Sequence, residues 1–407
     1  MSKTETPSIR FRGFDDAWEQ RKAIDVADYS KGNGYSKGDL IDVGTPIILY
    51  GRLYTKYQFA ISEVDTFAVP RNGAVYSQGN EVIVPASGET AEDIARASAV
   101  EKSGVLLGGD LNILRPFDFI NPLFLALAIS NGEPQKELAK KAQGKSVVHI
   151  HNTDIQEVTI AYPSKAEQDR IVSVFRQLDN LITLHQRKFE KLTNVKKSML
   201  EKMFPRNGSC YPEIRFKGFT DPWEQRKVGD LLIERNQQAP MSDEYPLMAF
   251  IASEGVAPKG ERYDRSALVT DTVNKLYKKT EKGDFIYSSN NLETGSIGLN
   301  KYGKACISPV YSIFEPTGIA DSDFLGRRLV RKDFINAMVK WRQGVIYGQW
   351  RIHESDFLKI EITVPSVEEQ RKIGAYLDQL DNLITLHQRE LEKLQSTKKA
   401  LLEKMFV

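Results

Sequence analysis

Two segments of the chain, residues 164–204 and 366–406, place apolar side chains at seven-residue intervals. In the first segment two such series run four residues apart, one through Ile171, Leu178, His185, Leu192 and Met199, the other through Phe175, Ile182, Phe189 and Met203. This spacing predicts a long amphipathic helix whose stripe packs against another helix in a coiled-coil seam. A helix of about 40 residues would be about 60 Å long.

Both segments have a recognisable start. Ser164 and Ser366 each follow a proline and precede a glutamate by three residues, which is the pattern of a capping box at a helix N-terminus. Phe204-Pro205 ends the first helix, and residues 205–213 have the composition of a linker. Two matching helices in one chain are expected to pair, and for the seam we expect contacts from Leu178, Ile182, Leu192, Leu380, Ile384 and Leu394.

The two segments are copies of each other. They align without a gap at an offset of 202, with 25 of 41 positions identical. A shorter echo opens each half, where residues 9–14 and 18–22 return as residues 214–219 and 223–227. The chain is therefore built twice on one plan, and we expect the following parts: domain 1–163, helix 164–204, linker 205–213, domain 214–365 and helix 366–407.

Between these shared ends lie two inserts with little sequence in common. Residues 45–50, 81–85 and 284–287 are rich in β-branched and aromatic side chains and bounded by turn residues, which predicts strands. Residues 117–130 and 333–343 are expected to be helical. The predicted fold class is α+β, with two mixed α/β domains, two long helices and a pseudo-two-fold internal repeat.

Composition narrows the class of protein. A chain of 407 residues with 41% apolar and 27% charged side chains fits two globular domains. No apolar run is long enough to cross a bilayer and the N-terminus lacks a signal peptide, so we expect a cytoplasmic protein. With only two cysteines, the chain can build neither a disulfide framework nor a thiolate zinc site.

Charge by itself does not indicate DNA binding. Residues 9–163 carry 16 basic and 20 acidic side chains, and residues 214–363 carry 22 and 20. A nucleic-acid binder usually shows a concentrated basic footprint. One local cluster could bind DNA, although a run of charges is more often a solvated face; it comprises Lys259, Arg262, Arg265, Lys275, Lys278, Lys279 and Lys282.

No catalytic motif is complete. Residues 144–146 resemble the end of a phosphate-binding loop, but Ala139 stands where its first glycine is required. Residues 121–124 resemble the Asn-Pro-Pro-Phe loop of adenine methyltransferases, but Leu123 replaces the second proline. The His-x-x-Asp pairs at 151–154 and 353–356 have no repeated nucleophile beside them, so a structural brace is favoured over a base with its orienting carboxylate. We expect no metal site.

The repeated frame and its two unlike inserts resemble those of a known protein family. Two unlike inserts, closed by residues 162–171 and 364–373 and followed by a long helix, are similar to the specificity subunits of type I restriction-modification systems. Residues 50–56, 86–90 and 108–110 resemble one class of target recognition domain, and residues 284–289 and 308–311 resemble another. The resemblance covers nearly the whole chain.

The resemblance implies a non-catalytic chain that selects a DNA site. Each target recognition domain would bind one half of a split double-stranded sequence, and the antiparallel helices would set the spacing. Two methylation subunits, carrying S-adenosylmethionine and modifying adenine N6, would dock on the chain, and motor subunits using ATP and Mg²⁺ would cut unmethylated DNA. A coiled-coil scaffold that reads no DNA is the alternative.

Candidate DNA contacts lie in both inserts. They are Arg52, Tyr54, Lys56, Ser87 and Thr90 in the first and Lys275, Lys278, Asn290 and Asn291 in the second. Tyr54 has an equally good explanation as a half-buried strand aromatic, and Asn290-Asn291 as a turn.

Overall fold

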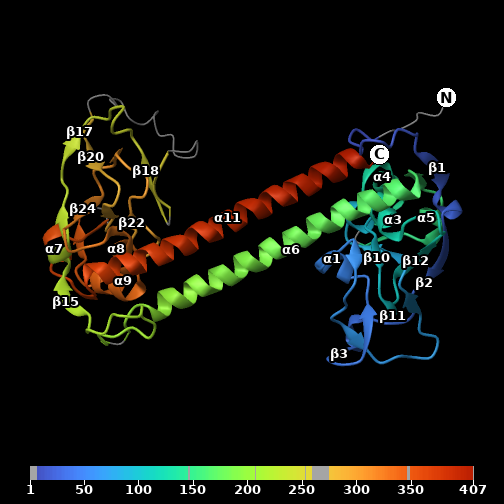
Figure 1. Ribbon diagram of the computed structural model, residues 1–407, viewed down its shortest axis with the longest axis horizontal. Coiled ribbons are helices and arrows are strands. Elements are labelled where there is room, and N and C mark those ends of the chain that lie inside the picture. The colour runs from blue at the N-terminus through green and yellow to red at the C-terminus, as the bar shows by residue number, and fades with distance from the viewer. Residues whose placement is uncertain are drawn as a thin grey trace. The chain divides into compact units, whose positions relative to one another are not determined.

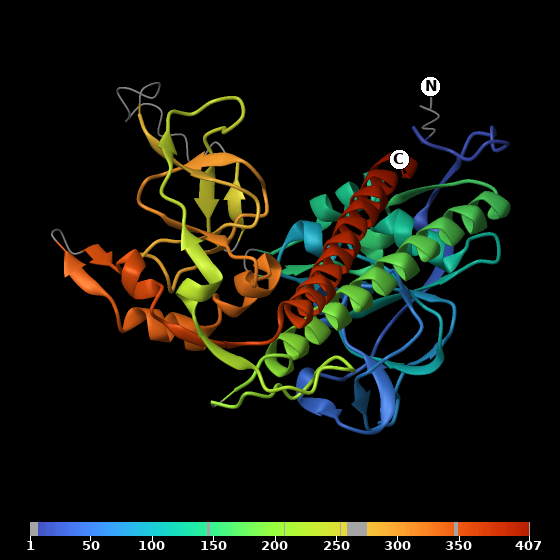
Figure 2. The same cartoon turned by 60° about the vertical axis from the view of Figure 1, so that its left-hand side comes forward.

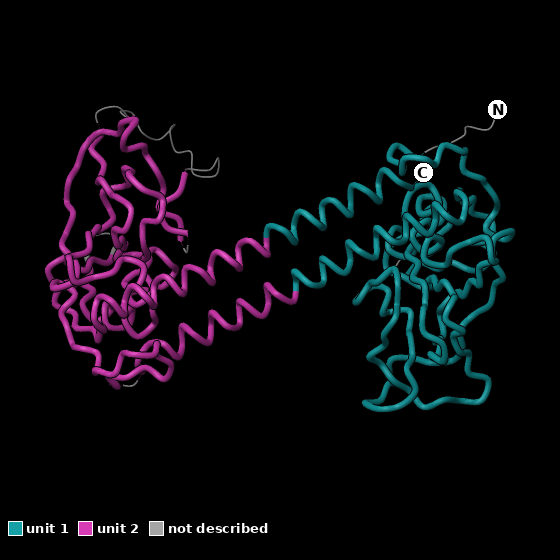
Figure 3. Tube along the Cα trace, in the orientation of Figure 1, with its two compact units in different colours: residues 1–186, 389–407 teal, residues 187–388 magenta. Residues whose placement is uncertain are grey.

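The computed structural model describes residues 7–144, 147–206, 208–252, 254–258, 275–345 and 349–406. Part of the basic cluster (Lys259, Arg262, Arg265) and part of the incomplete phosphate-loop match (145–146) lie outside these residues. The chain divides into two compact units, unit 1 with residues 1–186 and 389–407 and unit 2 with residues 187–388 (Figure 3). Each unit contains one insert and half of each long helix, so the boundary between the two units falls in the middle of both helices. The sequence-based domain boundaries, which set the helices apart, stay a prediction.

The two long helices are present where the heptads predict them. They are α6 (Lys165–Lys202) and α11 (Val367–Met405) (Figure 1). The Glu369 N–H donates to Ser366 Oγ at 3.4 Å, as a serine N-cap does. No helix of the described residues is both long and apolar enough to span a membrane.

Within each unit the helix halves run antiparallel. In unit 1 Phe175 packs near Phe406, with ring centroids 6.0 Å apart, while Asp179, further along α6, pairs with Lys398, further back along α11. Figures 1 and 2 both show these halves side by side. In unit 2 Lys196 Nζ lies 2.5 Å from Asp381 Oδ1. The expected fold class, two mixed α/β domains with paired long helices, is confirmed.

The predicted seam residues are not equally buried. Leu380 is 6% exposed and belongs to the core of unit 2, and Leu178 and Leu192 are half-buried against the cores of units 1 and 2. Ile182, Ile384 and Leu394 are half-buried. Two helices cover only part of each other's surface, so full burial is reached only where an insert also packs on the seam.

In unit 1 an antiparallel sheet forms the centre of the insert. Its strand order is β2-β12-β8-β10-β5, with the bounds β2 (Ala27–Lys31), β12 (Leu111–Pro116), β8 (Glu81–Pro85), β10 (Ser98–Val100) and β5 (Ala60–Ile61). Only the β10–β5 pair is parallel. A second sheet has the order β3-β6-β4-β11-β7, with β3 (Leu40–Ile41), β6 (Phe67–Ala68), β4 (Thr45–Ile48), β11 (Ser103–Leu107) and β7 (Tyr76–Gln78). The strand predicted at 81–85 is confirmed as β8, with the same bounds.

Short helices cover the central sheet of unit 1. The helix expected at 117–130 is confirmed but begins later, as α3 (Pro122–Ile129), because Pro122 occupies its first turn and Asn121 Oδ1 accepts the Leu123 N–H at 2.9 Å. The other helices are α1 (Arg52–Thr55), α2 (Ala91–Ile94), α4 (Gly132–Lys141) and α5 (Asn152–Gln156).

The central sheet of unit 2 repeats this topology despite its unlike sequence. Its antiparallel order is β16-β24-β21-β22, with β16 (Leu232–Glu234), β24 (Ser312–Pro316), β21 (Phe285–Tyr287) and β22 (Ile297–Leu299). By chain order these strands correspond to β2, β12, β8 and β10. The insert of unit 2 also contains the elements α7 (Val228–Leu231), β17 (Gln238–Ala239), β18 (Ala249–Ile251), β19 (Gly255–Ala257), β20 (Tyr277–Thr280), β23 (Ala305–Ile307), α8 (Ser322–Arg328), α9 (Lys332–Val339) and α10 (Glu354–Phe357).

A common frame closes both inserts. The repeated Glu-Gln-Arg-Lys segment forms β1 (Glu19–Lys22) and β15 (Glu224–Lys227), which pair antiparallel with β14 (Thr159–Tyr162) and β27 (Glu361–Val364), the strands just before the long helices. Each insert is thus a loop that leaves and returns through the same two-stranded ladder.

A buried ion pair fixes the start of each long helix to this frame. Arg10 Nε and Nη2 donate to the two oxygens of Glu167, both at 2.8 Å, and Arg215 makes the same two bonds to Glu369. Both carboxylates are 1% exposed. The glutamates that suggested a capping box are therefore bound by arginines from the opening repeat, and Glu167 raises the pKa of Arg10. We call each pair the Arg–Glu clamp.

The helix ends complete the cores. In unit 1 Phe406 lies 5.7 Å from Phe124 between ring centroids, and in unit 2 Phe204 lies 5.5 Å from Phe324 and 6.1 Å from Trp223. Phe204 and Phe406 are the same position of the repeat. Each core is therefore completed by a phenylalanine from the other copy of the repeat: Phe406, after α11, lies in unit 1, and Phe204, after α6, lies in unit 2.

Candidate nucleic-acid interface

The basic residues predicted to contact DNA in unit 1 are engaged by one aspartate. Arg52 Nη1 and Lys56 Nζ both bind the Asp65 carboxylate, and the Arg52 side chain is only 8% exposed. Lys56 and Arg52 hold the pKa of Asp65 well below its usual range, so this carboxylate is ionised at neutral pH. DNA that contacts these two cations would compete with Asp65 for them.

The other three candidates of unit 1 stabilise local structure. Tyr54 Oη donates to the Ser87 carbonyl at 2.8 Å, and burial raises the pKa of Tyr54. Ser87 is buried, with its Oγ 3.1 Å from His149 Nδ1. Thr90 Oγ1 accepts the Asp93 N–H at 3.0 Å as the N-cap of α2. The structure brings Tyr54 and Ser87 together and assigns Thr90 a capping role; DNA contact by these residues stays a prediction.

The candidates of unit 2 are dispersed. Lys275 is exposed beside the Tyr277 ring, whereas Lys278 is 7% exposed within β20. The Asn291 carbonyl accepts the Ser296 N–H at 2.9 Å, which is the turn that its sequence allowed. Asn290 Oδ1 accepts the Trp350 N–H at 2.6 Å and so fixes a neighbouring hairpin.

The His-x-x-Asp pairs begin short helices. The Asp154 carboxylate accepts the His151 N–H at 2.8 Å at the start of α5, and the His353 carbonyl accepts the Asp356 N–H at 2.9 Å at the start of α10. This arrangement agrees with a brace. Among the residues that the structure describes, no group of three His, Cys, Asp or Glu side chains is placed to hold a metal ion.

A hairpin just before each His-x-x-Asp pair was missed by the sequence analysis. In unit 2, β25 (Gln343–Val345) pairs antiparallel with β26 (Gln349–Arg351), and Gln343 lies opposite Arg351. In unit 1, Gln143 lies opposite His149 in a shorter hairpin, which also pairs through β13 (Val148–His149) with β9 (Ser87–Gly88). The available signal was Gln-Gly at 143–144 and 343–344, each followed by a shared Ile-His.

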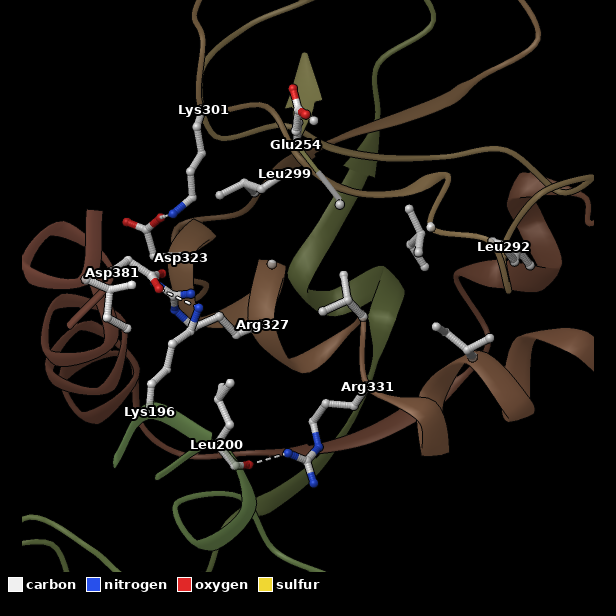
Figure 4. A pocket seen from close by; sticks show the side chains of 18 of the residues that line it. Lys196, Leu200, Glu254, Leu292, Leu299, Lys301, Asp323, Arg327, Arg331 and Asp381 are labelled. Carbon is white, nitrogen blue, oxygen red and sulfur yellow. Dashed lines mark hydrogen bonds and ion pairs between the residues drawn. The ribbon is translucent and has the colours of Figure 1, made fainter. Parts of the chain in front are cut away.

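Each unit also contains a hollow between its insert and its helix halves. The hollow of unit 2 has a volume of about 830 Å³, and Figure 4 shows Arg327 beside Asp381, to which it lies 3.0 Å away, with Arg331 bonded to the Leu200 carbonyl. That of unit 1 measures about 620 Å³. Burial and neighbouring Asp378 raise the pKa of Asp323 at the rim in unit 2.

The helix walls of the two hollows are equivalent. Lys196, Leu200, Asp381, Ile384 and Thr385 line the hollow of unit 2, and the residues 202 positions away in the repeat line that of unit 1, namely Lys398, Leu402, Asp179, Ile182 and Thr183. The insert walls differ. The same set of helix residues therefore lines a hollow in each unit, next to a different insert.

Comparison with known proteins gives consistent results. The family described as "Type I restriction modification DNA specificity domain" matches residues 15–194 and again residues 220–396. Two specificity subunits of type I restriction enzymes from Methanocaldococcus jannaschii are similar: MjaX is 25% identical over 312 residues (73% of this chain, 70% of the relative), and MjaVIII is 22% identical over 359 residues (81% and 79%). The crystal structure of a type I restriction-modification S subunit from M. genitalium shares the fold, with a TM-score of 0.60 at 16% identity over 99% of both chains.

Proposed function

This chain belongs to the type I restriction modification DNA specificity family, as a specificity subunit with two such domains, and we propose that each domain binds one half of a split DNA site. The observation that carries the proposal is the contrast within each unit. The frame is repeated, with 25 of 41 positions identical in its long helices, whereas the inserts share a central sheet and little sequence. One scaffold carrying two unlike inserts suits the recognition of two unlike half-sites. Base edges in the major groove would supply the sequence information, and phosphate contacts the register.

The long helices would set the distance between the half-sites. α6 and α11 contain 38 and 39 residues. At 1.5 Å per residue each is about 58 Å long, which corresponds to about 17 base pairs at 3.4 Å per pair. Two short half-sites with a non-specific gap fit within that length.

Two copies of a methylation subunit would dock on this chain. The equivalent helix walls of the two hollows support a partner that binds twice. On both helices the repeat also leaves two leucines exposed at a spacing of three residues, Leu181 with Leu184 and Leu383 with Leu386. Apolar side chains that are repeated and solvent-exposed are typical of a protein-binding surface.

The chain itself would carry out neither methylation nor cleavage. S-adenosylmethionine would be held by the methylation subunits, and ATP and Mg²⁺ by motor subunits joining the same complex. The work would take place in the cytoplasm, where the DNA lies. The absence of a complete catalytic motif in the sequence supports this division.

The proposal is tested by mapping adenine methylation at base resolution in cells that express this chain with its cognate methylation subunit. We expect a split motif that appears only when the chain is present. Replacing residues 228–360 with residues 23–158 keeps both frame ladders and puts the first insert in both units. The motif should then become two-fold symmetric with an unchanged gap. A motif that ignores the exchange would indicate a scaffold that reads no DNA.

A further inference from the structure

The hairpin before each His-x-x-Asp pair occupies one place in both units. It follows a helix of the insert, α4 in unit 1 and α9 in unit 2, and its last strand leads into a buried isoleucine, Ile150 or Ile352. His149 and Arg351, the residues before these isoleucines, are equivalent in the repeat and face a glutamine, Gln143 or Gln343. The base of each hairpin is therefore fixed by the same two features, a strand pairing with a glutamine and a buried isoleucine.

In both units the hairpin is attached just beyond a strand of the central sheet, by a backbone acceptor in unit 1 and a side-chain acceptor in unit 2. In unit 1 the Ile150 N–H donates to the Ala86 carbonyl at 3.0 Å, just beyond β8. In unit 2 the Ile352 N–H donates to Ser289 Oγ at 3.0 Å, just beyond β21, which is the counterpart of β8. Asn290 adds its bond to the Trp350 N–H. These bonds hold the backbone on both sides of Arg351, so its side chain leaves the hairpin from a fixed position.

The contents of the two hairpins differ strongly. Val148 is buried in unit 1, whereas its counterpart Trp350 is 48% exposed in unit 2. The side chain of Arg351 is 56% exposed, and its Nη2 lies 3.8 Å from Glu354 Oε2, which is longer than a hydrogen bond. A hairpin with a purely structural role would be expected to bury its tryptophan.

A second arginine lies under this tryptophan. The Arg342 guanidinium is 6.0 Å from the centroid of the Trp350 ring, and its Nη1 lies 3.0 Å from Glu293. Its side chain is 10% exposed, and its Nε and Nη2 have no hydrogen-bond partner among the described residues. The hairpin thus combines an exposed aromatic ring with two arginines.

We propose that the paired strands β25 and β26 are the part of unit 2 that enters the DNA major groove, with Arg351 contacting a base edge and Trp350 packing beside it. The inference rests on the proposed function and names the residues that perform it. A two-stranded β-ribbon fits the width of the major groove, and an arginine is the commonest reader of guanine there. Strand β13 of unit 1, with His149 in the place of Arg351, is the corresponding element for the other half-site.

The test is the methylation motif of variants that are expressed with the cognate methylation subunit. Arg351→Ala should relax one or two base pairs of one half-site, with discrimination there falling roughly 5- to 150-fold, and leave the other half-site and the gap unchanged. Trp350→Ala should act on the same half-site. Matched controls are Arg226→Ala and Tyr302→Ala, which remove an exposed arginine of β15 and an exposed tyrosine of the second insert, and both should keep the full motif.

Arg351→Lys keeps the positive charge and the hairpin but loses the two-pronged hydrogen bonding of arginine. If Arg351→Ala abolishes methylation altogether, the lysine variant decides: relaxed discrimination in one half-site supports the proposal. An unchanged motif in Arg351→Lys and Trp350→Ala would overturn the hairpin as reader while leaving the proposed function intact. If the unaltered chain produced no split motif, the proposed function itself would fail.

Discussion

The two units differ least in the ladders and clamps that close each insert, and most in the hairpins and outer sheets of the inserts. Trp18 packs against Phe124 as Trp223 packs against Phe324. The paired ladders and the Arg–Glu clamps also recur, and the clamp bonds have the same lengths. The hairpins and the outer sheets have different lengths, strands and side chains. The repeat therefore preserves what closes and orients a domain, and the parts free to differ are those that could distinguish two DNA sequences.

The largest effect should come from breaking a clamp. Arg10→Ala leaves the Glu167 carboxylate buried without its partner, so unit 1 should lose about 3–5 kcal/mol of unfolding free energy. Arg215→Ala should cost unit 2 the same. Hydrogen exchange followed by mass spectrometry reports on each unit separately. Arg21→Ala, which removes an exposed ion pair, is the control and should change stability by less than about 1 kcal/mol. If only one of the two substitutions destabilised its own unit, the clamps would not be equivalent.

An intermediate effect should separate the two copies of the seam. Leu380→Ala removes a buried side chain and should destabilise unit 2 by about 2–4 kcal/mol, whereas half-buried Leu178→Ala should cost unit 1 about 1–2 kcal/mol. Leu386→Ala, at an exposed position of the same helix, should have almost no effect. Chemical unfolding of the purified chain measures all three. Unchanged stability in the double variant Leu178→Ala and Leu380→Ala would rule out the seam.

The smallest effect should be on DNA affinity. Asp65→Asn removes the negative charge that Arg52 and Lys56 share, so specific DNA should bind about 2- to 10-fold more tightly and with a steeper salt dependence if these cations contact phosphate. Because the pKa of Asp65 is lowered, its ion pairs persist above the pKa of an unfolded aspartate and are lost only as pH falls through the lowered value. Titration of the complex with methylation subunits over a range of salt concentrations measures the change.

The matched control is Glu224→Gln, which releases Arg226 on the frame of unit 2. It should leave DNA affinity unchanged. Equal affinity for Asp65→Asn and the original chain would remove Arg52 and Lys56 from the list of DNA contacts.

Much of the architecture could be predicted because it is encoded by local periodicity. The heptads give both long helices to within two residues, and the run of β-branched side chains at 81–85 gives β8. The central sheet of unit 2 could not be matched to that of unit 1, because strand order depends on contacts between distant segments and the inserts have little sequence in common. The same limit applied to Arg52 and Lys278, whose basic side chains suggested solvent exposure but which the fold largely covers.

The sequence by itself determined the doubling of the chain, its helices and its family, because identity at a fixed offset and a seven-residue period survive without any knowledge of the fold. Only the tertiary structure decided which partner each repeated residue takes: Arg10 with Glu167, Phe406 with Phe124, and the hairpin of each unit with its central sheet. These pairings join residues far apart in the chain, and burial, hydrogen-bond geometry and packing, rather than local propensity, select them.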